Sequence, residues 1–169
     1  MFSVDTDALG QWSETWSLAV VFGVASVPWT YAFVTGGVPL WPSFIASASF
    51  YAAGGGLDGL VRGYASNLAG ILYGAATLVV AAALGGGTVA LSVVVGLFML
   101  LASLHEAVSP LSFTPGGFFG YATLFSVHAA GATAFGVAGL AGETLAAVVS
   151  MLLGACIGLG TERVSERLA

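Results

Sequence analysis

The sequence predicts an all-α membrane protein with six transmembrane helices arranged as a 3+3 inverted repeat. Three observations lead to this prediction. Of the 169 residues, 58% are hydrophobic and 7% are charged, whereas about 25% are charged in a typical soluble domain. Long uncharged stretches alternate with short breaks rich in glycine and proline. Similar segments also recur in the two halves of the chain. We expect residues 1–169 to form a single integral membrane domain.

The number of helices follows from the positions of the charged residues. These leave four uncharged stretches, at 15–57, 63–105, 107–142 and 144–161. Because a spanning helix needs about 20 residues, the first two stretches hold two spans each and the last holds one. The third stretch has room for one span and a connection, which brings the total to six.

Glycine and proline are expected to separate the helices, because both interrupt regular structure. The breaks fall at Gly36–Pro39, Gly54–Gly59, Gly85–Gly87, Ser109–Pro110 and the run up to Gly142. The predicted spans are therefore 16–35, 39–55, 64–84, 88–107, 114–131 and 142–160. Residues 129–142 form a loop, an extension of the fifth span or a re-entrant segment, and the sequence leaves these alternatives open.

The arginines predict the orientation of the chain. The cations are Arg62, after the second span, and Arg163 and Arg167, after the sixth. With six spans all three lie on one side, which the positive-inside rule assigns to the cytoplasm. We therefore expect both termini to be cytoplasmic in a prokaryotic cell membrane. The net charge of -5 argues against binding to nucleic acid, which requires cations that neutralise phosphates.

Matches between the two halves predict an internal repeat. Residues 43–49 align with residues 117–123, and each segment closely follows a proline. A Gly-x-x-x-Gly pattern also occurs once in each half. Its members are Gly70, Gly74, Gly154 and Gly158.

The predicted repeat units cover residues 16–84 and 88–160 and are joined at Gly85–Gly87. The second unit contains extra residues, which we place between Ala129 and Gly142. Because each unit has an odd number of spans, the two units are expected to have opposite orientations, as in many channels and transporters.

Three short motifs carry a resemblance to a known family. They are a Pro-x-Phe at Pro42, a Gly-Gly-x-x-Gly at Gly55–Gly59 and a Phe-x-Pro-Gly-x-Phe ending at Phe118. With a first span that contains tryptophan, they resemble a family of small prokaryotic inner-membrane proteins of unknown function typified by YcdZ. The resemblance covers residues 16–160. It implies six spans and supplies no substrate, cofactor or catalytic residue.

The four glycines of the Gly-x-x-x-Gly patterns are candidates for helix packing, since a helix face without side chains lets another backbone approach closely. An alternative role for such small residues is to line a narrow pore.

Pro42 and Pro115 are expected in the first turns of their helices, where proline costs no hydrogen bond. A sharper hypothesis is that they begin short helices whose N-termini point into the membrane. Phe44 and Phe118 would then form an apolar constriction, although aromatic residues in membrane helices usually only pack.

Asn67 and His128 are the polar candidates within the spans, where such residues suggest a functional role. His128 is a candidate for a proton-sensitive gate or a lining residue, with a buried or interfacial histidine as the alternative. Asn67 fits an interhelical hydrogen bond better than a selectivity element. They lie toward opposite faces of the predicted topology, so no direct contact is expected. His105 and Glu106 lack the H-E-x-x-H spacing of metalloproteases.

No catalytic motif, metal site or cofactor site is predicted. The sequence instead favours a passive channel or simple carrier for a small neutral or weakly polar solute. The alternative is a structural or accessory membrane protein that binds a partner helix, a lipid or a pigment. Contact with the lipid bilayer is expected for both functions, and a homo-oligomer is predicted because the glycine-rich faces offer interfaces.

Overall fold

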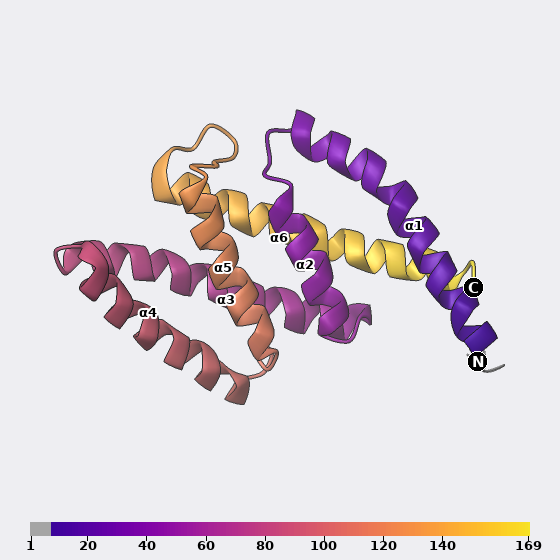
Figure 1. The fold of residues 1–169 in the computed structure, drawn as a ribbon, viewed down its shortest axis with the longest axis horizontal. Helices are drawn as coiled ribbons and strands as arrows, with labels where there is room; N and C mark the ends of the chain where they lie inside the picture. Colours follow the sequence, from indigo (N-terminus) through magenta and orange to yellow (C-terminus); the bar gives the residue numbers. More distant parts are fainter. Residues whose placement is uncertain (1–7) are drawn as a thin grey trace, which may run out of the picture.

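The computed structural model describes residues 8–169, with side chains from residue 15, and this part of the chain is entirely helical between its turns and loops (Figure 1). The prediction of an all-α fold with six helices is confirmed. The elements are α1 (Ala8–Thr35), α2 (Trp41–Ala52), α3 (Gly56–Ala83), α4 (Gly87–Leu104), the 3-10 helix η1 (His105–Ala107), α5 (Thr114–Ala129) and α6 (Gly139–Glu166).

Two runs of glycine make the tight turns that the sequence predicts. Gly54, Gly55 and Gly56 join α2 to α3 with φ angles of 104°, 68° and 61°. The run Gly85–Gly87 joins α3 to α4 with φ angles of 93°, 70° and 83°. A residue with a Cβ atom rarely adopts positive φ, so three in succession require glycine.

The helix boundaries differ from the prediction where charged residues were taken to end a helix. Helix α3 begins at Gly56 instead of residue 64, and Asp58 therefore lies in its first turn. Arg62 donates a hydrogen bond from Nη2 to the carbonyl oxygen of Ala53 at 2.7 Å. A helix can continue beyond the apolar layer, so a charge does not mark its end. Residues 130–138, left open above, form a loop between α5 and α6.

Four helices are long and apolar enough to cross a membrane: Thr15–Thr35 of α1, Gly56–Ala83, Gly87–Ala107 and Gly139–Glu166. Helices α2 and α5 have 12 and 16 residues, which corresponds to roughly 18 and 24 Å at 1.5 Å per residue. The hydrocarbon core of a bilayer is about 30 Å thick. These two helices are therefore shorter than a full perpendicular span.

The short helices pack on the long ones. The most extensive contacts join α5 to α3 and α2 to α6, and α3 also packs on α6 (Figure 1). Helix α1 packs on α6, and α4 packs on α3. The buried hydrophobic cluster is formed mainly by small and aliphatic side chains of α2, α3, α5 and α6: Ala46, Ile71, Leu124, Val127, Ala134, Ala146, Ala147, Met151 and Ala155.

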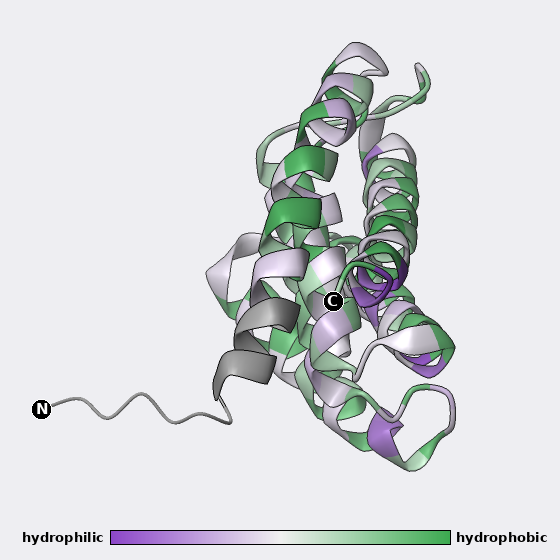
Figure 2. Cartoon of the chain, turned by 90° about the vertical axis from the view of Figure 1, so that its right-hand side faces the viewer, coloured by the Kyte–Doolittle hydropathy of each residue, from purple (hydrophilic) through white to green (hydrophobic). Residues whose placement is uncertain are grey.

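Helices α1 and α4 lie at the periphery and keep apolar faces exposed. On α1 the exposed face includes Val24 and Val27, and on α4 it includes Val89 and Val93. Figure 2 shows helices coloured in a mixture of hydrophobic and weakly polar shades, with few strongly hydrophilic positions. An exterior of this kind fits a hydrocarbon environment.

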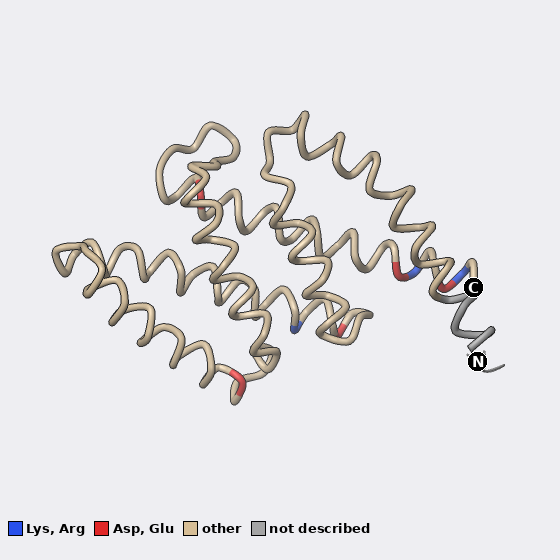
Figure 3. The backbone as a smooth tube through the Cα atoms, in the orientation of Figure 1, with Lys and Arg blue, Asp and Glu red and all other residues tan. Residues whose placement is uncertain are grey.

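Charged residues lie at helix ends (Figure 3). Arg62 is near the α2–α3 turn, and Arg163 and Arg167 are at the C-terminal end of α6. In Figure 3 Arg163 and Arg167 lie beside the C-terminus at the right, and Arg62 lies in the lower middle of the view. Glu143, near the start of α6, lies at the opposite end.

Candidate functional site

Two helix crossings form the centre of the molecule, α5 on α3 and α2 on α6. At the first crossing, a Cβ atom on Gly70 would overlap the carbonyl oxygen of Gly117. At the second, a Cβ atom on Gly154 would overlap the carbonyl oxygen of Ser43. The lack of a side chain at both glycines therefore lets the two backbones touch, which brings van der Waals contact that larger residues would prevent.

One turn further along each long helix, a second glycine makes room for a large side chain. A Cβ atom on Gly74 would lie 2.9 Å from a methyl carbon of Leu124, and one on Gly158 would lie 2.8 Å from the ring of Phe50. Leu124 and Phe50 are buried, with 0% and 1% of their surface exposed. All four glycines singled out in the sequence thus lie at these crossings.

Asn67 joins three helices. Its side chain is fully buried on α3, and its amide lies 2.8 Å from the Ser49 hydroxyl on α2. The Asn67 amide is oriented with its nitrogen toward hydrogen-bond acceptors, because in the opposite orientation its oxygen would face only acceptors and its nitrogen only donors. The nitrogen then donates to Ser49 Oγ at 2.8 Å and to the carbonyl oxygen of Gly116 on α5 at 3.0 Å. Asn67 is therefore an interhelical hydrogen-bonding residue.

Several other polar side chains in the centre have no hydrogen-bond partner within the described part of the protein. They are the hydroxyls of Ser47, Ser66 and Thr123 and both ring nitrogens of His105. A buried polar group without a partner costs about 1–3 kcal/mol. Such groups are usually satisfied by a water or another small polar molecule.

Ser66, Asn67 and His105 lie around the start of α5, whereas Ser47 lies against Gly158 of α6. A Cβ atom on Gly116 would lie 2.8 Å from the Cβ of Ser66. A Cβ atom on Gly117 would lie 2.7 Å from a ring carbon of His105, and the His105 ring centroid is 6.1 Å from that of Tyr73. The Gly116–Gly117 backbone therefore lies between the polar residues of α3 on one side and His105 on the other.

Phe44 and Phe118 lie on the outward parts of α2 and α5, with 42% and 40% of their surface exposed. The Phe44 ring packs on Trp29, with 4.6 Å between ring centroids. Pro42 is buried in the first turn of α2, and Pro115 is exposed in the first turn of α5. The two phenylalanines are not part of the polar cluster.

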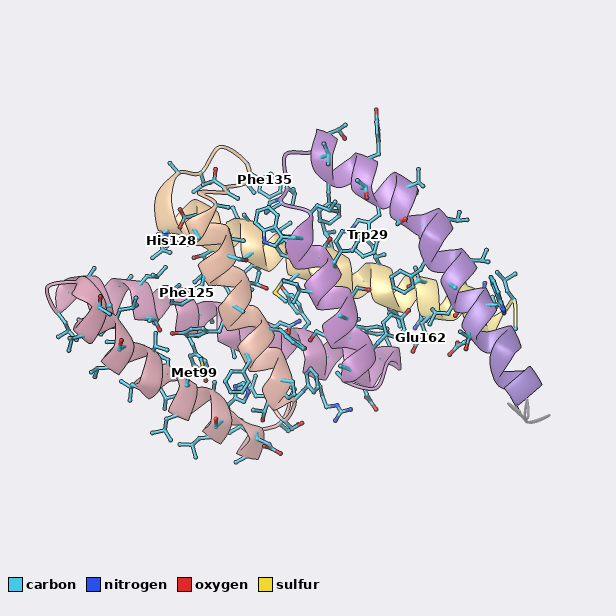
Figure 4. The ribbon with its side chains drawn as sticks, in the orientation of Figure 1. Trp29, Met99, Phe125, His128, Phe135 and Glu162 are labelled. Atoms are coloured by element: carbon cyan, nitrogen blue, oxygen red, sulfur yellow. The ribbon has the colours of Figure 1, made fainter. Side chains whose placement is uncertain are left out.

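His128 pairs with Glu143. Its Nδ1 lies 2.7 Å from Glu143 Oε2, and their side chains are 47% and 10% exposed. Figure 4 shows His128 where α5 meets the loop to α6, at the other end of the molecule from Glu162. The hydrogen bonds of His128 and Asn67 go to different partners. Glu143 had not been identified as the partner of His128, because 15 residues separate them in the sequence.

A polar pocket of about 370 Å³ opens at the C-terminal end of α6, between Ser17, Tyr51, Glu162 and Glu166. Glu162 accepts a hydrogen bond from the backbone N–H of Gly56 at 2.8 Å, which caps the start of α3. The Tyr51 hydroxyl lies 3.0 Å from that of Thr161. The first contact connects α3 to α6, and the second connects α2 to α6.

Within the described residues, no group of three or more His, Cys, Asp or Glu side chains is arranged to hold a metal ion. Sequence reasoning identified Asn67 but missed the hydroxyls around it. Ser47 and Ser49 lie within a short apolar helix, and Ser66 is adjacent to Asn67. The grouping of serines within the predicted spans was the sequence feature that could have identified these polar residues.

We predict that Gly154→Ala destabilises the protein by about 1–3 kcal/mol, the usual cost of overpacking. The added methyl meets the backbone of Ser43, which cannot rotate away as a side chain could. The unfolding temperature of the purified protein in detergent measures this effect. Gly160→Ala is the matched control, because it lies on the same helix and a Cβ atom there has nothing within 4 Å. Equal losses in both variants would contradict the close contact.

A second prediction compares adjacent residues of α3. Asn67→Leu keeps the approximate size but leaves the Ser49 hydroxyl and the Gly116 carbonyl without their partner, so we expect a loss of about 1–2 kcal/mol in unfolding free energy. Ser66→Ala removes a buried hydroxyl that has no hydrogen-bond partner among the described residues, so it is expected to cause no loss of stability and to raise the unfolding free energy by up to about 1–3 kcal/mol. Chemical unfolding in micelles measures both. A larger loss for Ser66→Ala than for Asn67→Leu would show that the hydrogen bonds are assigned wrongly.

Comparison with known proteins gives a family but no activity. No curated protein and no solved structure is significantly similar to the chain. The profile of one family, described as DUF1097 and as proteins of unknown function, matches residues 19–166. This match covers nearly all of the described helices. The chain therefore belongs to the DUF1097 family, as the resemblance to an uncharacterised family had led us to expect.

Proposed function

We propose that the protein provides a passive channel or a simple carrier path across the membrane for a small neutral or weakly polar solute. The observation that supports this proposal is the group of buried polar side chains without protein partners: Ser47, Ser66, Thr123 and His105. A protein with so apolar an exterior gains nothing in stability from burying these groups. They can serve a function if a polar solute that moves through the protein forms hydrogen bonds with them.

The chemistry of the interior favours a neutral solute. Buried ionisable side chains among the described residues that could compensate an ion are few: His105 lies at the end of α4, and Glu143 is already paired with His128. Moving an unpaired ion into such an interior costs far more than moving a neutral polar molecule. Hydroxyls and an imidazole can exchange hydrogen bonds with water, ammonia or an amide.

Corresponding contacts support the proposed 3+3 inverted repeat. In the predicted alignment Gly70 corresponds to Gly154, and Gly117 corresponds to Ser43. Each glycine touches the backbone of the aligned residue in the other unit's short helix. The larger arrangement follows the same pattern, because α5 packs on α3 as α2 packs on α6, and α4 packs on α3 as α1 packs on α6.

We further propose that all six helices cross the bilayer, with α2 and α5 as short central spans. Arg62 lies near the α2–α3 turn, and Arg163 and Arg167 lie at the C-terminal end of α6 (Figure 3). In a chain of six spans these positions share one side, which supports cytoplasmic termini in a prokaryotic cell membrane by the positive-inside rule. The exposed faces of α1 and α4 are available to lipid or to further copies, and we retain a homo-oligomer as part of the proposal. The likeness to proteins typified by YcdZ fits this arrangement.

The second candidate function is that of an accessory membrane protein that binds a partner helix, a lipid or a pigment. The observation that favours it is the large apolar exterior: in each of the peripheral spans Thr15–Thr35 and Gly87–Ala107, only 11% of the most apolar window is buried. A stoichiometric protein partner retained on purification would favour this function.

The transport prediction is tested with proteoliposomes under water, urea, glycerol and ammonia gradients. We expect flux above that of empty liposomes for at least one solute. Thr123→Val keeps the shape of the side chain and removes its hydroxyl, so flux should fall roughly two- to tenfold, as the loss of one hydrogen bond of about 0.5–1.5 kcal/mol would give. Thr35→Val makes the same change at an exposed position of α1 and should leave flux unchanged.

The variants Phe44→Trp and Phe118→Trp test whether the pathway is lined by the buried polar residues or by the two phenylalanines. If the path follows the buried polar residues, these outward substitutions leave flux unchanged, whereas a block by either would place the path along the phenylalanines. No flux above empty liposomes, from protein with an intact unfolding transition, would contradict the proposed function and favour the accessory role.

A further inference from the structure

An apolar groove runs between α1 and the C-terminal half of α6. It has a volume of about 560 Å³, within the range of pockets that bind small ligands. The hydroxyl of Thr161, which also lines it, is satisfied by the carbonyl oxygens of Ile157 and Gly158. The main lining residues are Val20, Val24 and Pro28 of α1 and Ile157, Gly160 and Val164 of α6. The groove therefore offers a ligand almost no polar contact.

The length of the groove fits within one leaflet of a bilayer. On α6 its lining extends from Ile157 to Val164, which corresponds to roughly 11 Å of helix at 1.5 Å per residue, and Leu168 lines it from the turn after the helix end at Glu166. Half of a hydrocarbon core is about 15 Å thick. The end of the groove at Leu168 lies next to the C-terminus of the chain, and the end at Ile157 lies further from the C-terminus along α6.

Two arginines flank the terminal end of the groove. Arg163 directly precedes the groove residue Val164 and so lies about 100° around the helix from it. Arg167, the first residue after α6, directly precedes the groove residue Leu168. The carboxylates Glu162 and Glu166 line the polar pocket on the other side. Both arginines are exposed and have no ion pair or hydrogen bond from their side chains within the described part of the chain.

We propose that this groove binds an anionic phospholipid, with one acyl chain between α1 and α6 and the phosphate on Arg163 and Arg167. The apolar walls match the chain, the depth fits within one leaflet, and the unpaired cations lie at headgroup level. Guanidinium groups bind phosphate oxygens through paired, charge-assisted hydrogen bonds. This lipid site does not depend on the proposed solute pathway.

The size of the groove argues against a partner helix as its occupant. A spanning helix about 10 Å wide and 30 Å long occupies roughly 2,400 Å³, about four times the volume of the groove. A slender acyl chain fits between the two helices without separating them. An uncharged pigment would leave the two arginines without a ligand.

The test uses the full chain in detergent, titrated with phosphatidylglycerol or phosphatidylcholine of identical acyl chains and followed by native mass spectrometry. We expect one phosphatidylglycerol bound per chain in preference to phosphatidylcholine. The double variant Arg163→Gln, Arg167→Gln should weaken phosphatidylglycerol binding about thirtyfold, as two cations near a membrane surface contribute, and should weaken binding of the zwitterionic phosphatidylcholine much less. Arg62→Gln is the charge control, in which the glutamine retains a donor for the Ala53 carbonyl.

A second variant tests the groove itself. Gly160→Leu fills the groove, and because a Cβ atom on Gly160 has nothing within 4 Å, the protein should fold normally. We expect it to lose the bound lipid, whereas Gly96→Leu, at an equally open position on α4, should retain it. Equal binding of both lipids by the native protein would overturn the proposal, as would unchanged binding in Gly160→Leu with its unfolding temperature preserved.

Discussion

The fold depends on direct backbone contact at two helix crossings. Gly70 against Gly117 and Gly154 against Ser43 bring the short helices as close to the long ones as backbone geometry permits. In lipid the hydrophobic effect does not drive helices together, because acyl chains are as apolar as leucine. Association must come from van der Waals contact and hydrogen bonds. Both increase as the helices approach, so the glycines determine where α2 and α5 lie.

The polar interior follows from this close approach. Once α5 lies against α3, the Gly116 carbonyl comes within reach of the Asn67 amide, which also reaches Ser49 on α2. The resulting bonds connect three helices at one buried residue. The same approach buries Ser66 and the ring of His105 with no protein partner. Tight packing therefore creates both a buried polar link between three helices and, beside it, the groups that have no partner among the described residues.

The sequence predicted what depends on composition and spacing, and missed what depends on contact across the chain. Glycine runs predicted the turns, since three successive positive φ angles exclude other residues. The Gly-x-x-x-Gly patterns predicted close packing but not the partner backbones. The positions of the charged residues led to a wrong start for α3, because the helix continues past the apolar stretch and carries Asp58 in its first turn. The short length of α2 was hidden by the apolar residues around it, and the outward direction of Phe44 could not be read from spacing.

The two halves share their packing but differ in polarity, and this difference points to where chemical selectivity would reside. In the alignment of the units, the buried Asn67 of α3 corresponds to Met151 of α6, and both are fully buried. Met151 has no hydrogen-bonding group to offer α2, whereas Asn67 connects α2 and α5. If the repeat supplies the scaffold, then the residues in which its units differ would supply the specificity of the proposed pathway. Asn67 would act from the α3–α5 side, and Ser47, which lies against Gly158 of α6, would act from the α2–α6 side.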